Sequence, residues 1–344
     1  MQRAAKSGLR RLVPVVALAL VTAGCSFEKL AADQFVPVLR KTSRSFNRSR
    51  VYRAARESAP ALLAQLEGIR AASPENEDLL LLTAELKAGF AFGFIEQEWR
   101  RAERDYREDD AAELKTWTNV LYDGAAAAAR QVLEQRSEGL PAKLDSLPAD
   151  KVEAALAAEL DKDDAPAVFW WAFARGAAIQ VNLDRGADVT KDVPRVKALM
   201  GWCLQQDERY YNGGAHLFFA LLNTALGKSI GGRPELAEEH LKAVERITGG
   251  RMLMAKVFRC QFVLPQLQTP SGNPTREERE AAQRKAWDEY IKTLEEVMAA
   301  PDDLWPEQAL LNVLAKRRAK DLYYRADDVL FPPPGVEIPS RDDE

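Results

Sequence analysis

Histidine and cysteine are scarce in this 344-residue chain, which holds two histidines and three cysteines. So few imidazole and thiol groups exclude a disulfide scaffold and leave little material for a metal site. Basic residues are not in excess, because the formal net charge is −4, and this balance argues against binding to nucleic acid. Glycine and proline stay near average, which excludes collagen-like and low-complexity classes. The chain is 47% hydrophobic and 29% charged, which is the composition of a globular protein with a sizeable core.

Motifs that carry well-known catalytic chemistry are also missing. The chain contains no HExxH pair for zinc, no CxxC and no phosphate-binding loop. We therefore expect a protein that is not an enzyme and that requires no metal and no cofactor.

The first 24 residues have the pattern of a secretory signal peptide. Four basic residues precede an apolar run from Leu12 to Val21, which is too short to span a bilayer as a helix. The small residues before Cys25 are typical of a lipobox, in which Cys25 becomes the first residue and carries acyl chains such as palmitate. Ser26 then favours the periplasmic face of the outer membrane. Cleavage by ordinary signal peptidase in the same segment, which would release a soluble protein, is the alternative.

From Phe27 onward the hydrophobic pattern is helical, and strand-like alternation is almost absent. The predicted fold class is all-α, with candidate helices at 28–45, 51–71, 74–106, 109–136, 151–160, 166–183, 194–206, 214–227, 234–247, 251–264, 276–299 and 304–326. Two helix starts have capping-box spacing, Asp150 with Glu153 and Thr275 with Glu278. Short connections without a sheet predict a right-handed helical-repeat array of divergent tetratricopeptide (TPR) type, although the repeat spacing is irregular.

The chain divides into four predicted parts. Residues 1–24 are the signal peptide, and 25–60 hold the lipid-anchored N-terminal segment with the first helices. Residues 61–331 form the TPR-like helical domain. The proline-rich end, 332–344, is predicted to leave the fold as a disordered tail.

Three segments are apolar on nearly every side when drawn as helices. They are 79–95, 168–174 and 215–226. The first carries only two charges, Glu85 and Lys87, and places Phe90 and Phe94 on one side with Phe92 on another. Such helices are either the buried centre of a helical array or a wall, with one face packed into the array and another lining a cavity that binds an apolar ligand.

Polar residues within or near these segments must be satisfied if they are buried. Arg175 lies one turn after Trp171, and we expect it to stack on that ring or to reach an acid on a neighbouring helix rather than an acidic ligand. His216 is expected to be a hydrogen-bonded core histidine rather than a ligand or a base. For Cys203 and Cys260 the sequence leaves open a disulfide or two buried thiols.

Charge is distributed unevenly near the predicted anchor. Residues 36–56 contain seven basic side chains and no acid. This run is either a solvated helix face or a surface for anionic headgroups or an acidic partner.

Several short stretches follow one another in a specific order between residues 61 and 331. They are Leu66-Glu-Gly-Ile, Ser73-Pro-Glu-Asn, Gly89-Phe-Ala-Phe-Gly-Phe, Val168-Phe-Trp-Trp-Ala-Phe-Ala-Arg-Gly, Tyr210-Tyr-Asn-Gly-Gly-Ala-His-Leu, Gly231-Gly-Arg-Pro and Leu311-Asn-Val-Leu-Ala-Lys-Arg-Arg-Ala. In this order the set resembles the TatT family, lipoproteins associated with some tripartite ATP-independent periplasmic (TRAP) transporters.

The resemblance implies a periplasmic lipoprotein on the outer membrane, built of TPR-like helices around an apolar channel and assembled as a homo-oligomer, a trimer. The implied partner is the transporter's solute-binding protein, to which a hydrophobic or organic-acid ligand would pass. The family's channel residues map onto Phe90, Phe92, Phe94, Trp170, Trp171, Phe173, Phe218 and Phe219.

We therefore predict a non-enzymatic accessory lipoprotein of a TRAP-type transporter. The alternative is a TPR-like scaffold for envelope protein assembly, in which the three apolar helices are solid core. An internal apolar cavity would favour the first hypothesis, and a core with no void larger than a few waters would favour the second.

Overall fold

The computed structural model describes residues 27–225, 233–270 and 272–340, and within these ranges it contains helices and no strand. The α-helices are the N-terminal helix (27–47), α2 (Tyr52–Ala72), α3 (Glu77–Phe90), α4 (Glu96–Arg104), α5 (Glu108–Arg136), α6 (Leu140–Ser146), α7 (Ala149–Glu159), α8 (Ala165–Val181), α9 (Ala187–Thr190), α10 (Val193–Gln206), α11 (Tyr210–Ala225), α12 (Pro234–Thr248), α13 (Leu253–Phe258), α14 (Leu264–Leu267), α15 (Arg276–Ala299), α16 (Ala309–Tyr323) and α17 (Ala326–Val329). The all-α fold class is confirmed, while the right-handed TPR-like repeat stays a prediction.

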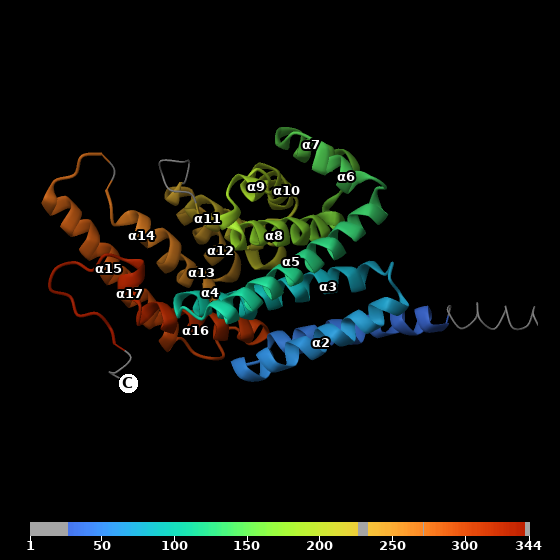
Figure 1. The fold of residues 1–344 in the computed structure, drawn as a ribbon, viewed down its shortest axis with the longest axis horizontal. Coiled ribbons are helices and arrows are strands. Elements are labelled where there is room, and N and C mark those ends of the chain that lie inside the picture. The colour runs from blue at the N-terminus through green and yellow to red at the C-terminus, as the bar shows by residue number, and fades with distance from the viewer. Residues whose placement is uncertain (1–26, 226–232, 271, 341–344) are drawn as a thin grey trace, which may run out of the picture.

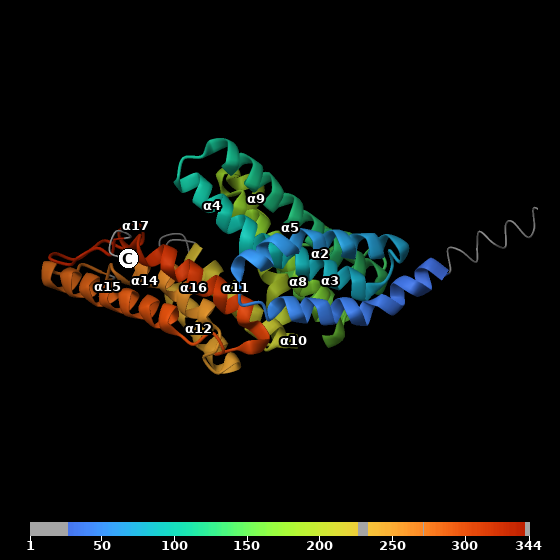
Figure 2. The ribbon, with the colours of Figure 1, turned by 90° about the horizontal axis from the view of Figure 1, so that it is seen from below.

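The N-terminal helix lies alongside α2 (Figures 1 and 2). A small cluster of buried side chains joins it to α2 and α3, formed by Val36, Leu39, Leu66, Leu79 and Leu82. The turn before α3 is fixed by hydrogen bonds, since the Asp33 carboxylate accepts from Ser73 Oγ and Asn76 Nδ2, each at 2.7 Å. Asn76 in turn caps α3 by accepting from the Leu79 N–H at 3.0 Å. The N-terminal helix is therefore part of the folded body.

The remaining helices gather in two groups, which occupy different ends of the view in Figure 1. One core forms around α3, α5, α8 and α10, with Tyr122, Trp171 and Trp202 fully buried. The other forms around α12, α13, α15 and α16, with Trp287 and Tyr290 buried. Helix α16 connects the groups, because its Leu314 side chain packs against both cores.

Two π-helical turns interrupt helices that the pattern predicts to be regular. Turn η1 (Ala91–Ile95) separates α3 from α4 within the predicted helix 74–106, and η5 (Arg259–Val263) separates α13 from α14. Three short 3₁₀ turns, η2 (Lys162–Asp164), η3 (Leu183–Arg185) and η6 (Pro306–Gln308), complete the described elements. A π turn holds an extra residue between hydrogen-bonded groups, so a sequence period of 3.6 does not reveal it.

Helix ends follow the predictions where a cap decides them. Thr275 and Glu278 form the predicted capping box, and α15 has the predicted bounds 276–299. The predicted box of Asp150 with Glu153 is wrong, because α7 begins directly after Pro148 and Asp150 lies in its first turn.

Part of the segment predicted as a tail contacts the body. Arg284 Nη2 donates to the Pro334 carbonyl at 2.6 Å. Directly before this segment, the Gln268 amide bonds the Phe331 backbone through both of its polar atoms. None of the helices in the described ranges is long and apolar enough to cross a membrane.

Candidate ligand-binding cavity

A cavity of about 500 Å³ lies where helices of the two groups meet. Its wall draws on the N-terminal helix, α2, α3, α8, α10, α11, α13 and α16, so the chain from Phe46 to Leu314 converges on it. Small-molecule sites in proteins span about 300–1,000 Å³. The space matches the volume of on the order of 17 water molecules, which is much more than a solid core contains.

Six of the eight aromatic candidates line this cavity. They are Phe90, Phe92, Phe94, Trp170, Phe173 and Phe218. Trp171 and Phe219 are not part of the wall and are buried, at 2% and 8% exposed. Trp171 lies under the Arg175 guanidinium, whose central carbon is 4.9 Å from the ring centroid, and Phe219 stacks on His240 at 5.3 Å. The structure thus assigns these two rings to packing, and ligand binding by the other six stays a prediction.

The aromatic wall is built from rings that meet edge to face. Phe92 lies between Phe173 and Phe258, with ring centroids 6.0 and 6.1 Å away. Phe90 and Phe94 lie together on the other side of their segment, 5.7 Å apart, as the helical spacing predicts. Phe92 keeps part of its surface accessible, while Phe90 and Phe94 are almost fully buried. Phe92 therefore offers the most contact area of the three to a ligand.

The start of α11 has an unusual backbone that shapes the cavity. Tyr211, Asn212 and Gly213 follow one another in the left-handed region, with φ of 48°, 60° and 82°. This conformation costs a tyrosine on the order of 1 kcal/mol or more, so the surroundings must hold it. The Tyr211 ring rests against Trp170, with centroids 4.6 Å apart. A Cβ at Gly214 would lie 2.6 Å from the Phe169 ring, so only glycine permits this approach.

Two carboxyl groups, Glu85 and Glu96, belong to the otherwise mainly apolar wall. Glu96 is occupied, since it accepts from the Tyr122 hydroxyl at 2.6 Å and from Arg100 Nη2 at 2.8 Å. Glu85 has no hydrogen-bond or ion-pair partner within the described part of the chain, and burial raises the pKa of its carboxyl group. The cavity therefore contains one acid that is free to bind something else.

Sequence reasoning did not select Glu85, Gly89, Tyr211 or Leu314 as wall residues. For Glu85 a signal existed, because it is one of only two charges in an apolar helix. Lys87, the other charge, pairs with Glu67 on α2, away from the wall. Leu314 gave no signal, since its place opposite Gly93 depends on how α16 packs.

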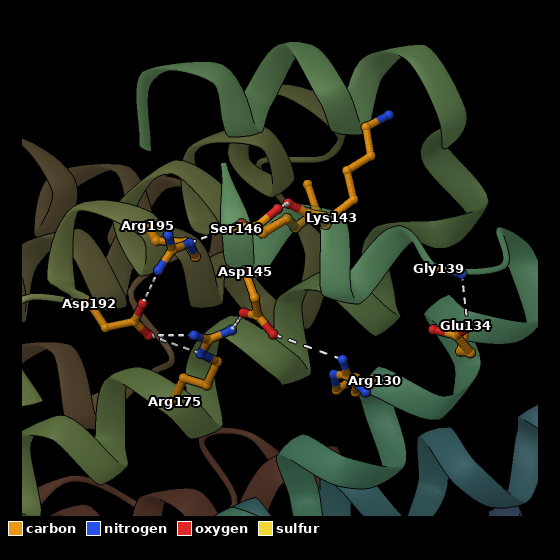
Figure 3. Close-up of polar contacts among 10 residues, drawn as sticks. Arg130, Glu134, Gly139, Lys143, Asp145, Ser146, Arg175, Asp192 and Arg195 are labelled. Carbon is orange, nitrogen blue, oxygen red and sulfur yellow. Dashed lines mark hydrogen bonds and ion pairs between the residues drawn. The ribbon is translucent and has the colours of Figure 1, made fainter. Parts of the chain in front are cut away.

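Arg175 is the centre of an ion-pair network on the side of α8 that carries Trp171 (Figure 3). Its guanidinium donates to Asp192 at 2.6 Å and to Asp145 at 2.6 Å. Arg195 donates to Asp192 as well, also at 2.6 Å, and to two backbone carbonyls at the end of α6. The prediction that Arg175 stacks on Trp171 or reaches a neighbouring acid is confirmed in both forms. These charges hold α6, α8 and α10 together and do not face the cavity.

The two histidines of the chain meet between α11 and α12. His216 Nδ1 lies 2.9 Å from His240 Nδ1, and His216 Nε2 lies 3.4 Å from Glu208. The prediction of a hydrogen-bonded His216 is confirmed. Burial lowers the pKa of both rings, to about 4 for His240, with a further contribution from the neighbouring His216.

The two cysteines of the body, Cys203 and Cys260, are free and buried, so of the two predicted alternatives the thiols are present. Burial raises the pKa of each thiol. Across the described ranges, no three His, Cys, Asp or Glu side chains gather into a group that could hold a metal ion.

The basic run at 36–56 is partly neutralised in the fold. Arg40 pairs with Asp78, and Arg56 pairs with Glu98 through Nε at 2.7 Å. The signal peptide, Cys25 and the Gly231-Gly turn lie outside the described residues.

Together, the fold and the cavity define an all-helical protein with an internal apolar space of ligand size. The family model of the TRAP transporter T-component matches residues 52–331, and the chain belongs to this family. Membership makes it an accessory component of TRAP-type transport and confirms the predicted family. No curated protein shows a significant match to the chain.

Proposed function

We propose that this chain binds the solute-binding protein of a TRAP transporter and holds a hydrophobic ligand that passes between the two proteins. The observation that carries the proposal is the cavity of about 500 Å³ with its aromatic and aliphatic wall. A T-component without ligand would have no need for such a space, because unfilled volume removes packing contacts and lowers stability. The cavity also favours this function over a scaffold with a solid core.

We also propose that the protein is a lipoprotein on the periplasmic face of the outer membrane, anchored through acyl chains on Cys25. We propose further that it works as a homotrimer. We expect a Cys25→Ala variant to lose palmitate labelling and to leave the membrane fraction. Unchanged labelling of this variant would contradict the anchor. Light scattering of the purified protein tests the trimer by its mass.

Co-purification tests the partner. The protein is isolated from its native envelope in mild detergent, and attached proteins are identified by mass spectrometry. A TRAP-type solute-binding protein at near-stoichiometric yield is the expected result. Recovery of envelope-assembly proteins alone, or of no partner, would contradict the transporter role and favour the scaffold.

A further inference from the structure

We infer that the cavity selects uncharged apolar molecules whose polar end donates a hydrogen bond to Glu85, and that it disfavours organic-acid anions. This inference rests on the proposed function and names its ligand class. A hydroxyl group on a long hydrocarbon chain is the simplest chemistry that fits. The charges of the wall and its polar groups without partners favour such a molecule.

The charges of the wall disfavour an anionic ligand. Among the described residues that line the cavity there is no lysine, arginine or histidine, whereas two are glutamates. Arg40, the cation that lowers the pKa of Glu85, pairs with Asp78 and is not part of the wall. A ligand carboxylate would enter a mainly apolar space without a counter-charge, and an unpaired anion is costly in such surroundings. The Glu85 carboxyl adds repulsion wherever it is ionised.

The polar groups of the wall can accept hydrogen bonds from a ligand. The carboxyl oxygens of Glu85 have no donor within the described residues, in contrast to those of Glu96, which Tyr122 and Arg100 satisfy. The side chains of Gln180 and Tyr211, also in the wall, have no hydrogen-bond partner there either. Glu85 and Tyr211 both line the cavity, and Glu85 contributes to raising the pKa of the Tyr211 hydroxyl. A few polar groups in a mainly apolar cavity are the arrangement that orients an amphipathic molecule.

Tyr211 lines the cavity with 41% of its surface accessible, and desolvation by the surrounding protein, followed by Glu85, raises the pKa of its hydroxyl well above the ordinary value. Its hydroxyl therefore keeps its proton at neutral pH and can donate to, or accept from, a ligand hydroxyl. A ligand hydroxyl in turn can donate to the Glu85 carboxyl, which accepts from no donor among the described residues. An anionic ligand supplies no such donor.

The test is displacement of the neutral dye 1-aminoanthracene by 1-dodecanol and by dodecanoate, at a pH where dodecanoate is ionised. The two competitors share one hydrocarbon chain and differ only in the head group. For the wild-type protein we expect dodecanol to bind about tenfold or more tightly than dodecanoate. Equal affinity, or tighter binding of dodecanoate, would overturn the inference.

Variants at Glu85 locate the cause. Glu85→Gln removes the charge with little change of shape. The affinity for dodecanoate should increase about threefold or more relative to the affinity for dodecanol. Glu85→Lys should reverse the preference. Glu113→Lys makes the same charge change on an exposed face of α5 and should leave the preference as it is. If the ratio of the affinities for dodecanol and dodecanoate stays unchanged in both Glu85 variants, the inference is also overturned.

A blocked cavity separates this inference from the proposed function. Gly89 lines the cavity, and a Cβ there meets no atom within 4 Å, so Gly89→Leu places a side chain in the open space. If dodecanol and dodecanoate bind equally well and both are lost in Gly89→Leu, the ligand cavity stands and only the selectivity is wrong. If neither displaces the dye from the wild-type protein, the ligand-carrying part of the proposed function is contradicted, and the inference with it.

Discussion

Arg175 and Glu85 are charged side chains on mainly apolar stretches of helix, and their surroundings differ completely. Arg175 donates to Asp145 and Asp192 and stacks on Trp171, whereas Glu85 has no partner in the described part of the chain. A charge with a full set of partners serves the fold. A charged group without one, in the wall of a cavity, is available for a ligand.

We predict that Arg175→Met lowers the free energy of unfolding by about 1–3 kcal/mol, because Asp145 loses its close partner and the α6–α8–α10 contacts weaken. Urea denaturation measures the loss. Arg53→Met, which removes an exposed pair with Glu57, is the control and should stay within about 0.5 kcal/mol. Loss of 1-aminoanthracene binding by folded Arg175→Met would show instead that Arg175 serves the cavity.

Residue types could be predicted from the sequence better than their surroundings. An acidic partner for Arg175 could be predicted because this residue lies on an apolar helix. Asp192 could not be identified as that partner, because it lies 17 residues later and the fold of the intervening turn brings it close. The eight aromatic residues were selected as one group. The structure separates them, since Trp171 and Phe219 face neighbouring helices and the rest face the cavity.

At the scale of elements, the contact between α11 and α12 contains both histidines. Their folded pKa values lie below the ordinary value of 6.5, so the unfolded chain binds protons first as the pH falls. The stability that they contribute is present above pH 6.5 and is lost as the pH falls toward about 4, the folded pKa of His240. The charged groups around the pair are Glu208, which raises the pKa of His216, and Arg246, which lowers it.

We predict that the melting temperature decreases as the pH is lowered from about 7 to about 5. In this range histidine titrates and most carboxylates stay ionised. His240→Gln cannot take up the proton and should show a smaller fall over the same range. The measurement is a set of melting curves for both proteins in matched buffers. Parallel pH dependence of the two proteins would exclude the pair as the cause.

Elements were predictable where local chemistry decides their ends. The Thr275 cap gave α15 its start, and the apolar patterns gave α5, α8 and α10 within one or two residues. The π turns η1 and η5 and the left-handed start of α11 were not predictable, because tertiary contacts hold them rather than local propensity. All three segments contain or adjoin wall residues of the cavity.

At the scale of the whole molecule, the cavity exists because two cores meet without filling the space between them. Its wall takes residues from Phe46 to Leu314, and α16 returns to pack beside the first helices. The sequence indicated an aromatic wall as one of two interpretations. It could not decide between a wall and a solid core, because that difference depends on how helices far apart in the chain are spaced.

The claim that the cavity holds a ligand is therefore best tested by a substitution that fills the cavity. Gly89→Leu should leave the fold stable, since leucine favours a helix over glycine by roughly 0.5–1 kcal/mol and its Cβ meets no neighbour. Gly68→Leu is the matched control, because Gly68 is an exposed helical glycine on α2 whose Cβ also meets nothing and which does not line the cavity.

The most direct measurement is mass spectrometry of the small molecules that stay bound to the three proteins when they are purified in parallel under mild conditions. We predict an apolar, uncharged molecule at near-stoichiometric yield in the wild-type protein and in Gly68→Leu, and its loss in Gly89→Leu. The same yield in Gly89→Leu as in the wild-type protein, or no bound molecule in any of the three, would contradict the account.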